Sequence, residues 1–264
     1  FTAHVQALRA RGDAASIARA DEDERCVQYV LDEEAGSLAR LFPNGDLMMD
    51  CDGNGALLPE RRNQATGRGM VLSDFANHPD ARDAGLQRHH VAAARLYTSP
   101  AYKSINEPLR DQQRFRDGRP HPLAVTVAFI DAAAKKLRSI SAHRPHANES
   151  RPLFRGMSDV RMPDAFLTEG GTELAPMSAT FDLDTAVSFA TGGQRATVMR
   201  IHNTNWTSRG ADVGFLSCFP AEEESLFPPL TYMECRPSAD ATPSVTTAGG
   251  VVLDVIDIEA KQLT

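Results

Sequence analysis

The stretch FPAEEESLFPP, residues 219–229, places three consecutive carboxylates between an aromatic-proline turn and a short apolar run that ends in two prolines. Adjacent like charges cost stability, so packing alone would not select them beside an apolar strand. In an extended strand, residues i and i+2 point to the same face. We therefore expect Glu222 and Glu224 to share one face, while Glu223 points away.

Two interpretations of this stretch are equally good when it is taken alone. Two carboxylates aimed into one site can stabilise a sugar cation and polarise an attacking group. The alternative is an acidic turn that is simply solvated. The neighbouring segments of the sequence decide between them.

The second half of the chain is predicted to be rich in short strands separated by turns. A polar segment with two prolines, residues 141–152, marks the start of this half. One helix is expected over residues 183–191, where Gly192-Gly193 ends it. Strands are predicted at residues 152–156, 174–180, 197–202, 224–227, 232–236 and 251–258.

Arg155 lies inside the otherwise apolar segment LFRGM, residues 153–157. Arginine is rarely buried unpaired, and its planar guanidinium suits a diphosphate. Gly156 beside it would let a ligand approach the backbone closely. Taken alone, the pattern is better explained by an edge-strand arginine that faces water.

Ser178 and Thr180 follow in PMSATF, residues 176–181. Their spacing places both hydroxyls on one strand face, where each can donate to a carboxylate. Thr180 or Asp182 can also cap the next helix, which leaves Ser178 free. An arginine, then Ser-x-Thr, then Glu-x-Glu on successive strands is far more specific than any one of the three.

The first half of the chain is predicted to be helical and shows no chemistry of its own. Apolar residues at helical spacing indicate the helices. They are expected within residues 1–42, with a second segment from Asp21 and a stop at 43–45, and over residues 80–97, 99–109 and 123–140.

Two details of this half concern charged or ligand-forming side chains. His90 is expected to be packed and His89 to lie on the surface, because adjacent helical residues point in different directions. Residues 59–70, which include Arg61 and Arg62, are expected to form an exposed loop.

Residues 50–55, DCDGNG, have the acidic spacing that opens a calcium-binding loop, with Gly55 at its sharp turn. The twelfth position is Arg61 instead of glutamate, so an acidic turn is the favoured interpretation. We expect no metal.

The four cysteines, Cys26, Cys51, Cys218 and Cys235, contain no CxxC pair that would indicate zinc. Free thiols are favoured over a disulfide between Cys218 and Cys235, which flank the acidic stretch.

Composition excludes several classes of protein. The 264 residues suffice for one large or two small domains, and 42% hydrophobic with 24% charged residues is typical of a globular protein. The net charge of −7 argues against general affinity for nucleic acid or anionic membranes. No apolar run is long enough to span a bilayer, and no GxGxxG or P-loop pattern supports such a nucleotide site.

The ordered set of Arg155, Ser178-x-Thr180 and Glu222-x-Glu224 resembles the arginine-specific mono-ADP-ribosyltransferases of the R-S-E class. Cholera-type toxins and vertebrate ecto-enzymes share this family. The likeness covers roughly residues 70–260.

Two longer segments carry the same resemblance. Residues 95–98, RLYT, together with Tyr102, Ile105-Asn106 and Leu109-Arg110, are similar to the helical segment before the catalytic core of eukaryotic members. Residues 222–229, EEESLFPP, are close to the family's Glu-x-Glu followed by an apolar pair and Pro-Pro.

The resemblance implies an α+β fold, in which a helical layer packs on a split core of two roughly perpendicular antiparallel sheets that form an NAD cleft. It implies an N-terminal helical and loop extension, residues 1–69, before the transferase domain, residues 70–264. Within that domain, residues 70–141 would be helical and residues 150–264 would form the β-rich catalytic core.

The resemblance also implies a role for each residue that binds NAD. Arg155 would hold the NAD phosphates and the nicotinamide ribose, and the Gly156 backbone would contact the nicotinamide amide. Ser178 would orient the catalytic Glu224, with Thr180 supporting the strand.

The remaining implied roles concern the reaction. Glu224 would bond the ribose 2′-hydroxyl and stabilise the oxocarbenium ion, while Glu222 would engage the acceptor guanidinium. Phe219 would lie in the turn that recognises the acceptor. In the family, glutamate at the position of Glu222 goes with arginine acceptors and glutamine with asparagine acceptors.

The activity we expect is transfer of ADP-ribose from NAD+, as co-substrate, to an exposed arginine of a protein. An NAD glycohydrolase that uses water and a non-catalytic module that binds NAD or a protein stay as alternatives. The nicotinamide-clamping aromatic is unassigned between Phe181 and Phe189, because the short segment 192–195 contains none. The start at Phe1 indicates a fragment or a processed form, and it leaves secreted and cytoplasmic locations and the oligomeric state open.

Overall fold

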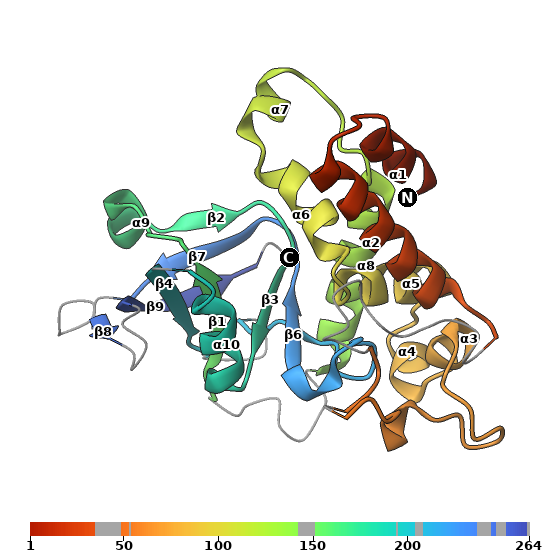
Figure 1. Cartoon of the computed structure of the whole chain (residues 1–264). Helices are drawn as coiled ribbons and strands as arrows, with labels where there is room; N and C mark the ends of the chain where they lie inside the picture. Colours follow the sequence, from red (N-terminus) through yellow and green to blue (C-terminus); the bar gives the residue numbers. More distant parts are fainter. Residues whose placement is uncertain are drawn as a thin grey trace. The chain divides into compact units, whose positions relative to one another are not determined.

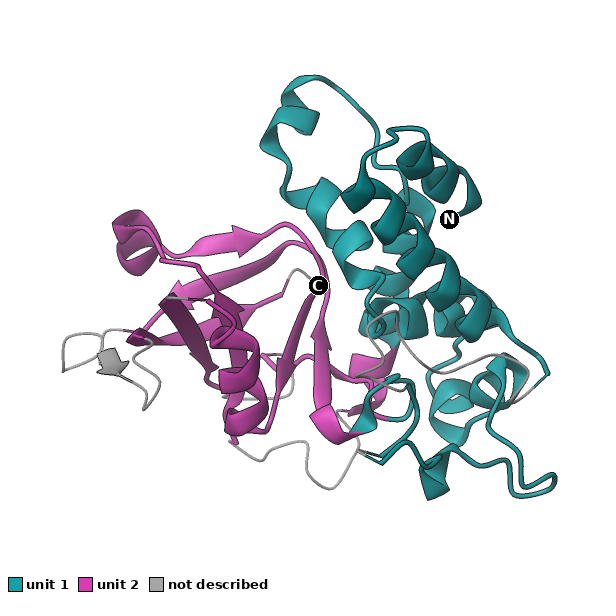
Figure 2. Ribbon diagram, in the orientation of Figure 1, with its two compact units in different colours: residues 1–136, 215–220 teal, residues 137–214, 221–264 magenta. Residues whose placement is uncertain are grey.

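The computed structural model describes residues 1–34, 49–52, 54–141, 151–193, 195–203, 208–236, 244–246 and 252–262. The chain divides into two compact units (Figures 1 and 2). Residues 1–136 and 215–220 form the helical unit, and residues 137–214 and 221–264 form the sheet unit. Several parts of the predicted elements lie outside the described residues. They are the helical segment over 35–42, its stop at 43–45, Gly53 of the acidic turn, the polar segment 142–150 and Gln194.

The helical unit confirms the prediction of a helical first half. Its elements are α1 (Thr2–Arg9), α2 (Ala14–Leu31), the 3-10 helix η1 (Pro59–Arg61), α3 (Leu72–Ala76), α4 (Pro79–Asp83), α5 (Arg88–Tyr97), α6 (Tyr102–Arg110), α7 (Gln112–Arg116) and α8 (Ala124–Ser141), whose last residues are grouped with the sheet unit.

Helix α2 begins earlier than the predicted start at Asp21. The Asp13 side chain accepts a hydrogen bond from the backbone N–H of Ser16 at 2.8 Å, which satisfies one of the free donors at the helix start. Cys26 and Val30 are fully buried on one face of this helix, and Ala20 is fully buried in another cluster with Val5 and Leu8. The cap, and not the apolar periodicity, therefore sets the beginning of α2.

The predicted helix over residues 80–97 is two helices, α4 and α5. Gly85 between them adopts φ +63°, a left-handed conformation that ends a helix at little cost for glycine. His90 is 8% exposed and its Nδ1 accepts from the Gln87 N–H at 3.0 Å, whereas His89 is exposed. The prediction for this histidine pair is confirmed.

The sheet unit contains every strand predicted from the sequence and the helix predicted over residues 183–191. Its elements are β1 (Leu153–Ser158), α9 (Asp164–Glu169), β2 (Gly171–Glu173), β3 (Met177–Thr180), α10 (Leu183–Ala190), β4 (Arg195–Ile201), β5 (Ala211–Asp212), β6 (Glu224–Phe227), β7 (Thr231–Cys235), β8 (Ser244–Thr246) and β9 (Val252–Lys261). The strands that the sequence did not indicate, β2, β5 and β8, are two or three residues long, too short to show an alternating pattern.

The described strands form one sheet in the order β2-β7-β9-β4-β1-β3-β6-β5, with β8 paired to β9. The β4–β9 pairing is parallel, so the structure replaces the predicted pair of separate antiparallel sheets by one mixed sheet. Strand β1 has six register pairs with β4 and one, Phe154 with Thr180, with β3. The sheet is therefore continuous through a narrow junction, beyond which β3 and β6 run in a different direction from β2 and β7 (Figure 1).

The two faces of β1 are buried differently. Leu153 and Met157 pack in the main apolar core of the sheet unit. Phe154 packs on the other face, against Val187 and Ala190 of α10. Alternation along the strand thus leaves Arg155 on the face of Leu153 and Met157.

Gly156 lies on the α10 face of β1. A Cβ at Gly156 would lie 1.8 Å from the Ala186 carbonyl oxygen and 3.0 Å from the Ala190 backbone nitrogen. Only a residue without a side chain lets the helix pack this closely. From the sequence we expected a ligand to approach the backbone of Gly156 closely. On this side of the strand, helix α10 makes that close approach instead.

Candidate active site

The Arg155 side chain is half-buried, and its Nη1 donates to the Ser178 carbonyl oxygen at 2.7 Å. Strand β1 lies between β3 and β4, so the alternative of an edge-strand arginine is wrong. The bond ties the guanidinium of Arg155 to the strand that carries the next predicted site residue.

Ser178 and Glu224 meet across the pair formed by β3 and β6. Their strands are antiparallel, with Ser178 opposite Leu226 and Thr180 opposite Glu224. The Ser178 hydroxyl donates to Glu224 Oε1 in a short contact. Glu224 itself is 7% exposed, and a buried carboxylate needs such a donor. This hydrogen bond fixes the orientation of the Glu224 carboxylate.

Thr180 holds the backbone that leads into Glu224. Its Oγ1 donates to the Glu222 carbonyl oxygen at 2.6 Å and accepts from the Asp182 N–H at 2.9 Å. Both partners are backbone groups, so the hydroxyl of Thr180 does not bond a carboxylate as Ser178 does. The strand-supporting position implied for Thr180 agrees with these bonds.

The path of the chain through Glu222 and Glu224 differs from the extended strand we expected. The 3-10 helix η2 (Pro220–Glu222) precedes β6, which starts at Glu224. Glu223 between them adopts φ +46°, an uncommon conformation for a residue with a side chain. A tight turn, and not the alternation of a strand, therefore sets the direction of Glu222.

Glu223 does point away, as predicted. Its side chain is 53% exposed, and its Oε2 lies 3.5 Å from Arg151 Nη2. Two exposed, flexible side chains at this distance contribute little to stability.

Glu222 has an environment that opposes its ionisation. Burial is the larger cause and the nearby Glu224 the second, and together they raise the pKa of Glu222 to about 7. Removing a carboxylate from water and placing it near a like charge both disfavour the charged form. A carboxyl group that titrates near neutral pH can accept a proton from a substrate at that pH.

Phe219 is half-buried and belongs to the helical unit, where it packs on a cluster that includes Cys218. Its backbone N–H donates to the Ser217 hydroxyl at 3.1 Å. Recognition of an acceptor by Phe219 stays a prediction.

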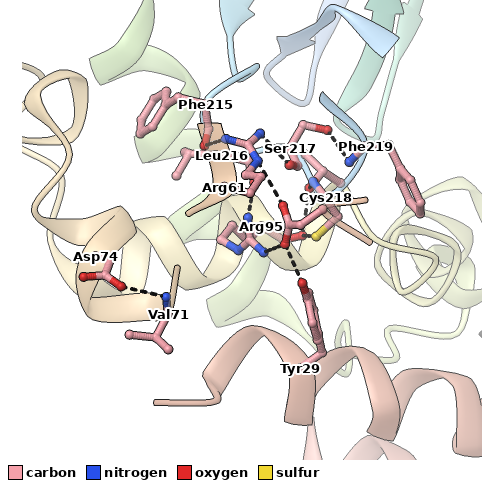
Figure 3. Close-up of polar contacts among 12 residues, drawn as sticks. Tyr29, Arg61, Val71, Asp74, Arg95, Phe215, Leu216, Ser217, Cys218 and Phe219 are labelled. Atoms are coloured by element: carbon pink, nitrogen blue, oxygen red, sulfur yellow. Dashed lines mark hydrogen bonds and ion pairs between the residues drawn. The ribbon is translucent and has the colours of Figure 1, made fainter. Parts of the chain in front are cut away.

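A set of buried charges in the helical unit was not found from the sequence. Asp50, Arg61 and Arg95 are each 2–3% exposed, and Figure 3 shows the polar contacts around both arginines. The prediction that residues 59–70 form an exposed loop is therefore wrong for Arg61. One sequence signal for these buried charges was available: Arg95 lies at helical spacing from the buried face of a helix, so a buried charge could have been expected there.

The predicted acidic turn is confirmed. Asp52 Oδ1 accepts from the backbone N–H groups of Asn54 and Ala56 at 2.9 and 2.8 Å. In the part of the chain that the structure describes, no group of three or more His, Cys, Asp or Glu residues is placed to hold a metal ion.

Two further findings concern the cysteines and the membrane. The four cysteines are free, as predicted, and burial raises the pKa of Cys218 to about 12. None of the helices in the described ranges is both long and apolar enough to cross a bilayer.

The model of the family described as ART, NAD:arginine ADP-ribosyltransferase, matches residues 59–244 of this chain. The match spans more than half of the sequence, and the chain belongs to this family. The resemblance inferred from the three motifs is thereby confirmed.

Several solved structures are similar to this chain. The ADP-ribosyltransferase HopU1 of Pseudomonas syringae pv. tomato DC3000 is 18% identical, with 90% of this chain and 97% of that chain covered and a TM-score of 0.49. The Vis toxin, an ADP-ribosyltransferase from Vibrio splendidus, is 16% identical, with 72% and 83% covered and a TM-score of 0.49. Exoenzyme S from Pseudomonas aeruginosa is 22% identical, with 70% and 86% covered and a TM-score of 0.44. No curated protein sequence matches the chain.

Proposed function

We propose that this protein transfers ADP-ribose from NAD+ to an arginine side chain of a target protein and releases nicotinamide. One observation carries the proposal: the sheet unit brings the Ser178–Glu224 hydrogen bond together with a second carboxyl group, Glu222, whose pKa is raised to about 7. An oriented carboxylate beside a titratable one suits a reaction that forms a sugar cation and then removes a proton from its acceptor.

The residues of the sheet unit fit NAD+ as a substrate. Arg155 offers a half-buried guanidinium, which is suited to the diphosphate, at the junction between β1 and β3. The NAD cleft, which the resemblance implied between two separate sheets, would instead lie at this junction within the one sheet. The backbone of Gly156 would contact the nicotinamide amide there. Residues 70–264 would form the transferase domain, with residues 1–69 as an N-terminal extension.

The first half of the reaction breaks the bond between C1′ of the nicotinamide ribose and the ring nitrogen. The electron pair leaves with the nitrogen, so nicotinamide departs neutral and needs little acid catalysis. Positive charge develops on the ribose as an oxocarbenium ion. Glu224, oriented by Ser178, accepts a hydrogen bond from the ribose 2′-hydroxyl and stabilises this charge.

The second half joins the acceptor to C1′. An arginine guanidinium is protonated in water and is a poor nucleophile. Glu222 attracts it and takes one proton as a guanidinium nitrogen forms the new bond to C1′. The products are ADP-ribosylarginine, nicotinamide and a proton. Phe219, which comes shortly before Glu222 in the chain, would contact the acceptor.

The test uses NAD+ labelled in its ADP-ribose part, with agmatine as a small guanidino acceptor. We expect label on agmatine and release of nicotinamide from the wild-type protein. Glu222→Ala should abolish the transfer but leave part of the NAD+ hydrolysis, whereas Glu224→Ala should abolish both. Glu223→Ala is the matched control, because Glu223 is exposed and points away.

The other functions predict different results. Nicotinamide release with no labelled agmatine or protein would identify an NAD glycohydrolase. No nicotinamide release would favour a binding module. A Glu224→Ala protein that still releases nicotinamide at the wild-type rate would refute the mechanism.

A further inference from the structure

Four consecutive backbone carbonyl groups, those of residues 215–218, are held by buried residues of the helical unit. Arg61 donates to the carbonyl oxygens of Phe215 at 2.9 Å and Ser217 at 3.0 Å. Arg95 donates to the Leu216 oxygen at 2.9 Å, and the Asp50 backbone N–H donates to the Cys218 oxygen at 2.8 Å. Figure 3 shows how the two guanidinium groups face this segment.

A single carboxylate links the two arginines. Asp50 Oδ1 lies 3.0 Å from Arg61 Nε, and Asp50 Oδ2 accepts from Arg95 Nη2 at 2.7 Å. The Tyr29 hydroxyl also donates to Asp50 Oδ2, at 2.6 Å. Burial lowers the pKa of Arg61. Burial also acts to lower the pKa of Arg95, but the groups around it, Asp50 foremost, together raise that pKa above its ordinary value. We call Asp50, Arg61 and Arg95 the buried ion cluster.

The buried ion cluster makes it costly for residues 215–218 to move. Guanidinium groups out of water need acceptors, and the carbonyl oxygens of this segment supply several. The end of the segment is held at both backbone groups, because the Cys218 N–H also donates to Thr98 Oγ1 at 3.0 Å. Arg95 is further fixed by the Phe75 ring, whose centre lies 3.8 Å from the guanidinium carbon.

The segment leads directly into the proposed acceptor residues. Phe219 directly follows Cys218, and Glu222 comes four positions after Cys218 in the chain. Because Cys218 is fixed at both of its backbone groups, the position of Phe219, the next residue of the same unit, is restricted as well.

We infer that Asp50, Arg61 and Arg95 are positioning residues for the acceptor half of the reaction, acting through the backbone of residues 215–218 on Phe219. The inference rests on the proposed function, in which Phe219 contacts the acceptor, and adds residues that do not touch either substrate. Loosening the segment should impair attack by the acceptor more than release of nicotinamide, which depends on Ser178 and Glu224.

The experiment compares agmatine labelling with NAD+ hydrolysis in Arg61→Met and in Leu8→Ala. Arg61→Met removes two bonds to the segment and leaves Asp50 paired with Arg95. Leu8→Ala is the control, because Leu8 is buried in a separate cluster with Val5 and Ala20. Activities are divided by the folded fraction measured by circular dichroism.

For Arg61→Met we expect kcat/KM for agmatine to fall about tenfold or more, while the hydrolysis rate and KM for NAD+ change by less than about twofold. Leu8→Ala should leave the ratio of the two activities unchanged. Thr98→Val, which removes the acceptor of the Cys218 N–H with little change in shape, should shift the ratio in the same direction by a smaller factor. If Arg61→Met does not fold, the result for Thr98→Val tests the inference.

Equal losses of transfer and hydrolysis in both Arg61→Met and Thr98→Val would overturn the inference, as would a similar shift of the ratio in Leu8→Ala. A wild-type protein that hydrolyses NAD+ without labelling agmatine would refute the proposed function and the inference with it. Labelling by the wild type with an unchanged ratio in the variants would refute the inference alone.

Discussion

Asp50 in the helical unit is a buried carboxylate surrounded by positive charges, whereas Glu222 in the sheet unit is a half-buried carboxylate beside a second carboxylate. Asp50 pairs with two guanidinium groups and accepts from Tyr29. Burial and the nearby Glu224 together raise the pKa of Glu222 to about 7. The first arrangement pairs opposite charges in the interior and serves structure. The second keeps a charge adjustable near neutral pH and serves proton transfer.

The largest effect on stability is expected at Asp50. Asp50→Asn would leave two buried guanidinium groups without their shared counter-charge, which should cost about 3–5 kcal/mol. Urea unfolding at pH 7 measures the loss, with the exposed Asp52→Asn as a control that should change stability much less. A cost below about 1 kcal/mol would mean that the carbonyl groups alone stabilise the arginines.

Glu224→Gln should reduce nicotinamide release about 10²–10³-fold, since it removes the charge that stabilises the oxocarbenium ion while keeping an acceptor for Ser178. Initial rates of NAD+ hydrolysis and of agmatine labelling should fall together. Glu223→Gln is the matched control and should leave both rates near the wild-type values. If agmatine labelling fell while NAD+ hydrolysis stayed near the wild-type rate, Glu224 would act only in the acceptor half of the reaction.

Glu222→Gln should stabilise the protein above neutral pH. The pKa of Glu222 is raised in the folded protein from an ordinary 4.5 to about 7, so its contribution to stability is full below pH 4.5 and is lost as the pH rises through 7. Glutamine does not titrate, and the variant should gain about 1–3 kcal/mol over the wild type at pH 8.5. Urea unfolding at pH 4.5 should show no such gain, and a gain equal at both pH values would contradict the titration of Glu222.

The pH dependence of transfer should follow the same group. Because Glu222 must be ionised to take a proton, kcat/KM for agmatine should rise about tenfold per pH unit below pH 7 and level off above it. Residual NAD+ hydrolysis by Glu222→Ala should lack this rise. An identical profile for hydrolysis in that variant would assign the titration to another group.

The contacts of the candidate active site could be predicted in part, because they depend on patterns over a few residues. The spacing of Ser178 and Thr180 placed both hydroxyls on one strand face, and Ser178 does donate to Glu224. The path through Glu223 could not be predicted, since a left-handed conformation is uncommon for glutamate and has no sequence signal here.

The buried ion cluster could not be predicted for a different reason. Asp50, Arg61 and Arg95 come from separate segments of the first half, and the carbonyl groups they hold come from residues 215–218. Asp50 and Arg61, taken alone, have the sequence pattern of surface charges, and only the helical spacing of Arg95 indicated burial. Burial became evident only when all four segments were in contact.

The sequence by itself determined the family and the strands that carry Arg155, Ser178 and Glu224, and the resemblance implied that Ser178 orients Glu224. These follow from alternation in short strands and from the order of three motifs, which are local properties of the chain. Tertiary structure alone decided that the strands join in one mixed sheet, that helix α10 occupies the space beside Gly156, and that Glu222 titrates near pH 7. Pairing partners, close packing and desolvation depend on residues far apart in the sequence, so no local pattern can encode them.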